Sequence, residues 1–379
     1  MLNSEYGPNV SNDAENFFQS DRDIELARQR DEKKSAIGST AGNPVQLPSK
    51  ILDFCFSSQS DGVSRIEAFV AESGHVARKV DLKTGKVLKT FRGHSGPVTS
   101  IAVVYDSTGV EAFVLTGSWD KTVRKWDIET ETCVHIYKGH SDFVKSIVVA
   151  GAHFYSGSSD STIRKWDLAT GQNVLTLKEH SRSVESLTID DDGEYLFSGS
   201  SDNTIKKWSL ISGKLEATLT GHLTSIYRLI VRDGSLWSVS ADKTARRWDL
   251  ETMQADSTFL HSDFVKSIDI GDRYIFTGSR DENIRVWDIG TEKCVKIIQG
   301  HYGEISAIRL LGTKIWTASL DGTIRSWSIL EEDIRALPDV TESIIEPVVD
   351  ESELEPPVAA PKMMTEDEER ELEELMGDD

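Results

Sequence analysis

Six stretches of one pattern determine the fold: GSWDKTVRKWD (117–127), GSSDSTIRKWD (157–167), GSSDNTIKKWS (199–209), VSADKTARRWD (239–249), GSRDENIRVWD (278–288) and ASLDGTIRSWS (318–328). Their tryptophans stand 40, 42, 40, 39 and 40 residues apart. Each stretch combines β-branched and aromatic residues with Gly, Ser and Asp, which favour strands and tight turns. No copy has an apolar run long enough for a helix, so the chain is expected to repeat a small all-β unit.

A recurring set of four residues runs through these copies. It consists of a leading His, a Ser or Thr four residues before the turn Asp, that Asp, and the Trp six residues after it. With its period, this set resembles the WD-repeat β-propeller family, in which the four side chains form a hydrogen-bonded chain. The resemblance implies six structural tetrads: His94, Thr116, Asp120, Trp126; His140, Ser156, Asp160, Trp166; His180, Ser198, Asp202, Trp208; His222, Ser238, Asp242, Trp248; His261, Thr277, Asp281, Trp287; and His301, Thr317, Asp321, Trp327.

A His, a Ser and an Asp also occur together in catalytic triads, but a triad is needed only once. Six repetitions therefore favour the structural interpretation, in which each carboxylate accepts several hydrogen bonds. The sequence also lacks a P-loop, a dinucleotide glycine pattern and metal-ligand spacing. We expect no catalytic residue, no metal, no cofactor and no enzymatic activity.

A weaker copy precedes the six. Residues 51–57, 65–71, 75–81 and 86–91 are spaced like four strands, but Val70, Gly74 and Val80 replace three tetrad residues. Counting it predicts a single propeller of seven four-stranded antiparallel blades, with the first blade held by packing alone. In the family, the outermost strand of the last blade comes from the N-terminal side, and NPVQLP (43–48) is our candidate. Closure matters because an open ring would leave sheet edges unpaired.

The two ends of the chain differ from the repeats in composition. Residues 331–379 contain 19 Asp and Glu but 3 Lys and Arg, which accounts for −16 of the net charge of −21. We therefore predict a polar, mostly disordered N-terminal segment (1–42) that can contain one short helix, a propeller (43–330) and a disordered acidic tail (331–379). The tail is either a solvated extension or a docking peptide for a basic partner.

Composition also indicates the cellular compartment and the class of partner to expect. The sequence has no secretory apolar region and no apolar run of transmembrane length. Cys55, Cys133 and Cys294 are odd in number and have no metal-ligand spacing, which predicts a reducing compartment, cytosol or nucleus. A nearly neutral propeller makes nucleic acid an unexpected partner.

The resemblance also implies where a partner binds. The family binds peptides mostly on its upper face, through residues three and five positions after the leading His and the residue before the turn Asp. Among these positions, the large apolar and basic ones form the candidate partner-binding set: Trp119, Phe143, Lys145, Tyr227, Phe264, Lys266, Arg280 and Leu320. Aromatic residues and Arg are the usual hot-spot types, although the same side chains could instead serve packing.

Two further patterns concern basic residues. The octapeptide HSDFVKSI occurs at 140–147 and 261–268, three blades apart, and would place the same Phe and Lys on nearly opposite sides of the channel. Lys125, Lys165, Lys207 and Arg247 directly precede a Trp, where related propellers have an apolar residue. They are interpreted as buried aliphatic stems with the charge led to solvent, or as a basic stripe for an acidic ligand.

Together these features predict a monomeric, non-catalytic scaffold that presents an aromatic and basic face to a protein or peptide, with an acidic or phosphorylated motif as ligand. The alternative is a substrate-recognition subunit of a ubiquitin ligase, a role that the family also supplies. That role needs a docking element for a cullin adaptor, and none is recognisable in the sequence.

Overall fold

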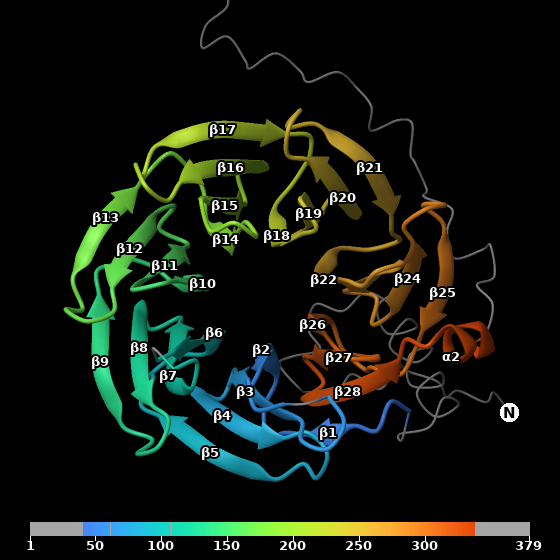
Figure 1. Ribbon diagram of the computed structural model, residues 1–379, viewed down its shortest axis with the longest axis horizontal. Coiled ribbons are helices and arrows are strands. Elements are labelled where there is room, and N and C mark those ends of the chain that lie inside the picture. The colour runs from blue at the N-terminus through green and yellow to red at the C-terminus, as the bar shows by residue number, and fades with distance from the viewer. Residues whose placement is uncertain (1–40, 61, 107, 338–379) are drawn as a thin grey trace, which may run out of the picture. The chain divides into compact units, whose positions relative to one another are not determined.

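The computed structural model describes residues 41–60, 62–106 and 108–337, and these form seven four-stranded antiparallel sheets. The innermost strands of neighbouring sheets contact one another around a complete ring (Figure 1). The predicted all-β, seven-bladed propeller is therefore confirmed.

The strands of blades 1 to 3 follow one another in the chain, from the channel to the rim. They are β2 (Ile51–Phe56), β3 (Glu67–Glu72), β4 (Val76–Asp81) and β5 (Val87–Arg92); β6 (Val98–Tyr105), β7 (Glu111–Ser118), β8 (Thr122–Asp127) and β9 (Cys133–Lys138); and β10 (Val144–Ala150), β11 (His153–Ser158), β12 (Ile163–Asp167) and β13 (Asn173–Leu177).

Blades 4 to 6 repeat this order, and blade 7 has three consecutive strands. They are β14 (Val184–Ile189), β15 (Tyr195–Ser200), β16 (Thr204–Ser209) and β17 (Leu215–Thr220); β18 (Ile226–Arg232), β19 (Ser235–Ser240), β20 (Thr244–Asp249) and β21 (Ala255–Leu260); β22 (Val265–Ile270), β23 (Tyr274–Ser279), β24 (Ile284–Asp288) and β25 (Cys294–Ile298); and β26 (Ile305–Leu311), β27 (Lys314–Ser319) and β28 (Thr323–Ser328).

The ring is closed by β1 (Val45–Gln46), which pairs antiparallel with β28 and completes blade 7. Val45 lies opposite Ile324, and the Leu47 N–H donates to the Gly322 carbonyl at 2.8 Å. Val45 and Leu47 are both buried in the core between blades 7 and 1. The predicted closing strand within residues 43–48 is thus confirmed.

The core is divided into seven apolar clusters, each lying between two neighbouring blades. Between blades 1 and 2, for example, Phe69 and Phe91 pack with Trp126 of the following blade. A single sheet buries neither of its faces alone, so each blade depends on both neighbours.

The chain departs from the predicted tail at residues 331–336, which form the helix α2 (Glu331–Ala336). Its Ile334 is buried in the core between blades 6 and 7, and the Lys296 ammonium donates to the Leu337 carbonyl at 2.7 Å. The acidic composition did not reveal this one apolar anchor. The rest of the expected tail and residues 1–40 lie outside the described residues.

Candidate functional site

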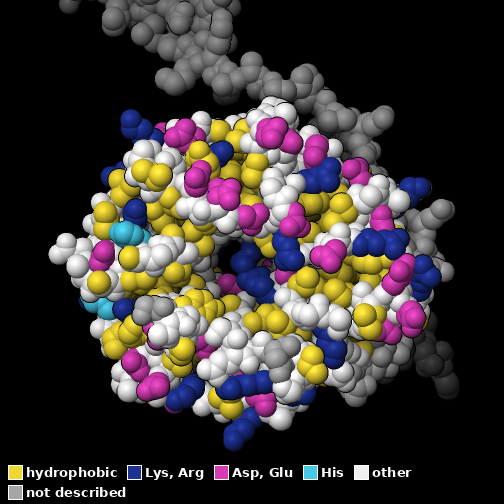
Figure 2. All heavy atoms as spheres, in the orientation of Figure 1, with side chains coloured by type: hydrophobic (Ala, Val, Ile, Leu, Met, Phe, Trp, Pro, Cys, Tyr) yellow, Lys and Arg dark blue, Asp and Glu magenta, His cyan; other side chains and the backbone are white. Residues whose placement is uncertain are grey.

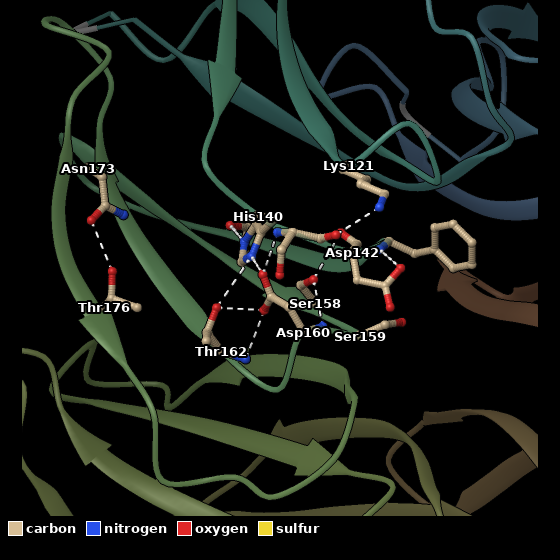
Figure 3. Close-up of polar contacts among 12 residues, drawn as sticks. Lys121, His140, Asp142, Ser158, Ser159, Asp160, Thr162, Asn173 and Thr176 are labelled. Atoms are coloured by element: carbon tan, nitrogen blue, oxygen red, sulfur yellow. Dashed lines mark hydrogen bonds and ion pairs between the residues drawn. The ribbon is translucent and has the colours of Figure 1, made fainter.

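The tetrads connect the blade surface to the core in five of the six copies. In blade 3, the Trp166 indole donates to Ser156 at 2.8 Å, and the Ser156 hydroxyl meets His140 Nε2 at 2.7 Å. His140 Nδ1 lies 2.8 Å from Asp160 Oδ2, and Figure 3 shows these two side chains beside each other. Equivalent bonds hold the tetrads of His94, His180, His222 and His301, with Nδ1–Oδ2 distances of 2.7, 2.8, 2.7 and 3.0 Å.

The turn carboxylates of these five copies are stabilised in their charged form. Burial raises the pKa of each Asp, but hydrogen bonds from the His and from a nearby Thr lower it more, so the pKa lies below its usual value. For Asp242 the pKa falls to about 2. These residues act together as structural links, because each polar atom of the set is used within its own blade.

The sixth copy differs from the expected tetrad. His261 still meets Thr277 at 2.8 Å, but its Nδ1 lies 3.1 Å from the Phe259 carbonyl instead of the turn Asp. Asp281 accepts hydrogen bonds from Arg285 at 2.6 Å and Ser262 at 2.8 Å. Burial, followed by the positive charge of Arg285, lowers the pKa of His261 to about 3.

A sequence difference accompanies this change. Five copies have a Thr two residues after the turn Asp, and its hydroxyl donates to the carboxylate at 2.6 Å. Asn283 stands at that position in the sixth copy and gives only its backbone N–H, at 3.0 Å. Asp281 is therefore held by fewer local donors and pairs with Arg285.

The missing tetrad of blade 1 predicted that this blade is held by packing alone. That prediction is wrong, because buried ion pairs also hold it. The Lys79 ammonium lies 3.0 Å from Glu67 and 3.1 Å from Glu111 of blade 2, and all three side chains are at most 8% exposed. On the other side of the blade, the buried pair of Arg78 and Glu72 is joined by the Ser49 hydroxyl, which donates to Glu72 at 2.6 Å. Ion pairs thus replace the tetrad where blade 1 joins the ring.

The upper face is the face on which each leading His and turn Asp lie. In six blades, the residue before the turn Asp donates its backbone N–H to the carbonyl of the residue three positions after the His, at 2.8–3.0 Å. The bonds run from Trp119 to Pro97, Ser159 to Phe143, Ser201 to Ser183, Ala241 to Ser225, Arg280 to Phe264 and Leu320 to Glu304. This common geometry gives equivalent positions the same place in every blade.

A register shift at the start of the innermost strand sets the direction of the side chain five positions after the leading His. Every innermost strand has a register shift near its start, and in six blades the skipped residue is this one. In blades 3, 5 and 6 it is Lys145, Tyr227 and Lys266. A bulge turns the extra residue away from regular pairing, so these side chains are presented toward neighbouring blades.

The predicted aromatic residues do not form one cluster. Trp119 of blade 2 stacks on Phe143 of blade 3, with ring centroids 4.9 Å apart and an interplanar angle of 14°. On the other side of the ring, Arg280 lies over the Phe264 ring at 5.3 Å, and Lys266 lies over Tyr227 at 3.5 Å. Leu320 is half-buried on blade 7. The two copies of HSDFVKSI therefore place Phe143 and Phe264 in different surroundings.

The lysines of this face are paired with acids of the next blade. Lys145 lies 3.6 Å from Glu185, and Lys266 lies 3.6 Å from Glu304. Of the three predicted basic residues, Arg280 has no ion pair among the described residues, and its side chain is exposed. The sequence did not reveal this pairing, because Glu185 and Glu304 occupy different positions in their copies.

The basic residues before the tryptophans form neither a free stripe nor simple buried stems. The ammonium groups of Lys125, Lys165 and Lys207 lie over Phe113, Tyr155 and Tyr195 at 3.9, 5.7 and 3.9 Å. Arg247 lies over Trp237 and is also paired with Asp256 at 2.8 Å. The sequence could have revealed these cation–π contacts, because an aromatic residue stands ten or twelve positions before each of these basic residues, on the neighbouring strand.

Charged side chains cross the central channel. Asp53 of blade 1 pairs with Arg309 of blade 7 at 2.7 Å and with Arg228 of blade 5 at 3.8 Å. Figure 2 shows Lys and Arg side chains at the central opening. Burial lowers the pKa of Arg228 to about 10, which leaves it charged at neutral pH. The channel is thus partly filled by an ionic bridge of one carboxylate and two guanidinium groups.

Within the described ranges, no group of three or more His, Cys, Asp or Glu side chains is placed to hold a metal ion. In the same ranges, no helix is both long and apolar enough to cross a membrane. Cys55, Cys133 and Cys294 are free thiols, and burial raises the pKa of Cys55 to about 12 and that of Cys294 to about 11. These two thiols therefore stay protonated at neutral pH.

Comparison with known proteins identifies the repeat. The family described as WD domain, G-beta repeat matches residues 85–127, 131–167, 171–209, 256–288 and 292–328. An uncharacterised WD repeat-containing protein of Schizosaccharomyces pombe is 32% identical over 383 residues, which cover 97% of this chain and 100% of the relative.

Other similarities are shorter or structural. Myosin heavy chain kinase C of Dictyostelium discoideum is 33% identical over 80 residues, which cover 21% of this chain and 10% of the kinase. The crystal structure of the computationally designed Ika8 protein matches with a TM-score of 0.61 and 24% identity, and covers 74% of this chain and 83% of that protein. WD-repeat propellers are generally non-catalytic and mediate protein interactions. The chain belongs to the WD-repeat family of β-propellers.

Proposed function

We propose that this propeller is a non-catalytic, monomeric scaffold that binds a peptide or protein segment on its upper face. The observation that carries the proposal is Trp119, which is 42% exposed although it stacks on Phe143. The tetrad needs neither ring, and a large exposed aromatic surface at the start of the innermost strands is suited to anchor a partner.

The charged side chains of the upper face indicate which chemical groups the ligand should carry. Because Lys145 and Lys266 are already paired with Glu185 and Glu304, they add little attraction for an acidic group. Arg280 remains the best site for an acidic or phosphorylated side chain. We therefore propose a ligand with an apolar or aromatic anchor at Trp119 and Phe143, and an acidic group toward Arg280. The free cysteines suit a reducing cytosol or nucleus.

Affinity purification of the full-length protein, with partners quantified by mass spectrometry, tests this function. Trp119→Ala is expected to weaken recovery of the main partner by about tenfold or more, because hot-spot truncations cost about 2 kcal/mol. The matched control is Val134→Ala, an exposed apolar residue on the outermost strand β9. Equal recovery with both variants would contradict the proposal, and recovery of cullin subunits would favour the ubiquitin-ligase role.

A further inference from the structure

The face opposite the upper face carries a second feature that the proposed function does not use. Two hollows lie there, of about 510 and 430 Å³, and they share Val149 and Gly151 among their lining residues. One extends toward Cys55 and Tyr105 of blades 1 and 2, and the other toward Ile189 and Ile211 of blade 4. We call this continuous depression the lower groove.

The lower groove is lined mainly by apolar side chains. Ile211 is 91% exposed and Tyr105 is 48% exposed, whereas Val149 is half-buried between them. In Figure 2, hydrophobic side chains gather between the central opening and the left edge, over the blade of β10 to β13. A contiguous exposed apolar surface marks an interaction site more often than scattered apolar residues do.

The polar groups that line the groove are already engaged. Lys165 lies over the Tyr155 ring at 5.7 Å, and His153 lies 3.9 Å from Asp167. These contacts fix the wall on the side of blade 3.

One border of the groove is strongly acidic. The turn between β14 and β15 carries the exposed side chains of Asp191, Asp192 and Glu194 around Gly193, which itself lines the groove. No ion pair holds these three carboxylates within the described part of the chain. Figure 2 shows acidic side chains over the blade of β14 to β17, beside the hydrophobic region. Such a border attracts positive charge and repels acidic segments.

We propose that the lower groove binds a second protein through a segment that places apolar side chains in the two hollows and Lys or Arg beside the acidic turn. The apolar lining supplies the contact area, and the acidic border fixes the orientation of the segment. This site is separate from the upper face and takes a ligand of opposite charge, so one propeller could join two different partners.

A display library of random 12-residue peptides, selected on the immobilised full-length protein, tests the proposal. Enriched peptides are then synthesised with a fluorophore, and their affinities are measured by fluorescence anisotropy. We expect enriched sequences to combine large apolar residues with Lys or Arg. Ile211→Asp and the double variant Asp191→Lys with Asp192→Lys should each weaken their binding by about tenfold or more.

The substitutions lie at exposed positions, so melting temperatures should stay unchanged and a loss of binding cannot come from unfolding. The upper-face variant Trp119→Ala is the control and should retain these peptides, which separates this site from the proposed function. The proposal is overturned if no peptide is enriched over the bare support, if enriched peptides carry acidic residues, or if both groove variants bind them unchanged.

Discussion

Replacing Lys79 by Met should be among the most damaging single changes to blade 1. The ammonium of Lys79 lies 3.0 Å from Glu67 and 3.1 Å from Glu111, and it joins blade 1 to blade 2. Burial raises the pKa of Glu67, but hydrogen bonds from Arg65 and Lys79 lower it below its usual value. Glu67 is therefore charged at neutral pH, and Lys79 contributes to holding it in that form.

The expected loss of unfolding free energy in Lys79→Met follows from the burial of the two carboxylates. Without Lys79, the 2% exposed Glu111 loses its cationic partner, and the 8% exposed Glu67 keeps only Arg65, whose own side chain is 52% exposed. Removing one partner of a buried ionic group costs about 3–5 kcal/mol of unfolding free energy. The matched control is Lys89→Met, because Lys89 pairs with Glu131 at 3.7 Å and the two side chains are 32% and 39% exposed. That exposed pair contributes about 0–1 kcal/mol.

Urea denaturation of both variants, followed by circular dichroism at pH 8 and pH 5, measures the difference. In Lys79→Met, the crowded carboxylates have raised pKa values in the folded protein, so protonation at low pH stabilises the fold. The loss should thus be smaller at pH 5 than at pH 8, and Glu67→Gln with Glu111→Gln should restore most of it. Equal midpoints for Lys79→Met and Lys89→Met would refute the reasoning.

The remaining predictions concern the tetrads. Asp202 accepts hydrogen bonds from His180, Ser181 and Thr204, so Asp202→Ala should cost about 1–3 kcal/mol by stranding buried donors; an unchanged thermal melting curve would contradict its role. His261 has a folded pKa of about 3 against 6.5 for the free side chain. Its contribution is therefore complete above pH 6.5 and is lost as the pH falls, by about 2 kcal/mol at pH 5. His261→Gln should flatten the stability profile between pH 7 and pH 5, and a profile as steep as that of the unsubstituted protein would exclude this assignment.

Much of the architecture could be predicted because it is encoded locally. The spacing of His, Ser or Thr, Asp and Trp predicted six blades, and the strand-like spacing of the weaker first copy added the seventh. The resemblance to the WD-repeat family implied the closing strand. The same spacing wrongly predicted a complete tetrad around His261. The hydrogen bonds there depend on Asn283 and Arg285 in addition to the four tetrad residues.

What could not be predicted depends on contacts between copies. Lys145 was expected to be available to a ligand, but Glu185 of the next blade pairs with it. Trp119 and Phe143 were predicted on the same face, yet only the structure brings their rings into contact, because neighbouring blades set the distance. The ionic cluster of Lys79 was missed for the same reason, since Glu111 belongs to another copy.

The pairing of β1 with β28 has a consequence for synthesis of the chain. The Gln46 side chain donates to the Gly322 carbonyl across a separation of 276 residues, and at 5–20 residues per second this interval takes on the order of 15–55 s. During that time Val45 and Leu47 have no sheet to join, and the core between blades 7 and 1 cannot form. The growing chain therefore keeps the apolar side chains of Val45 and Leu47 without their packing partners in blade 7 until that last blade emerges.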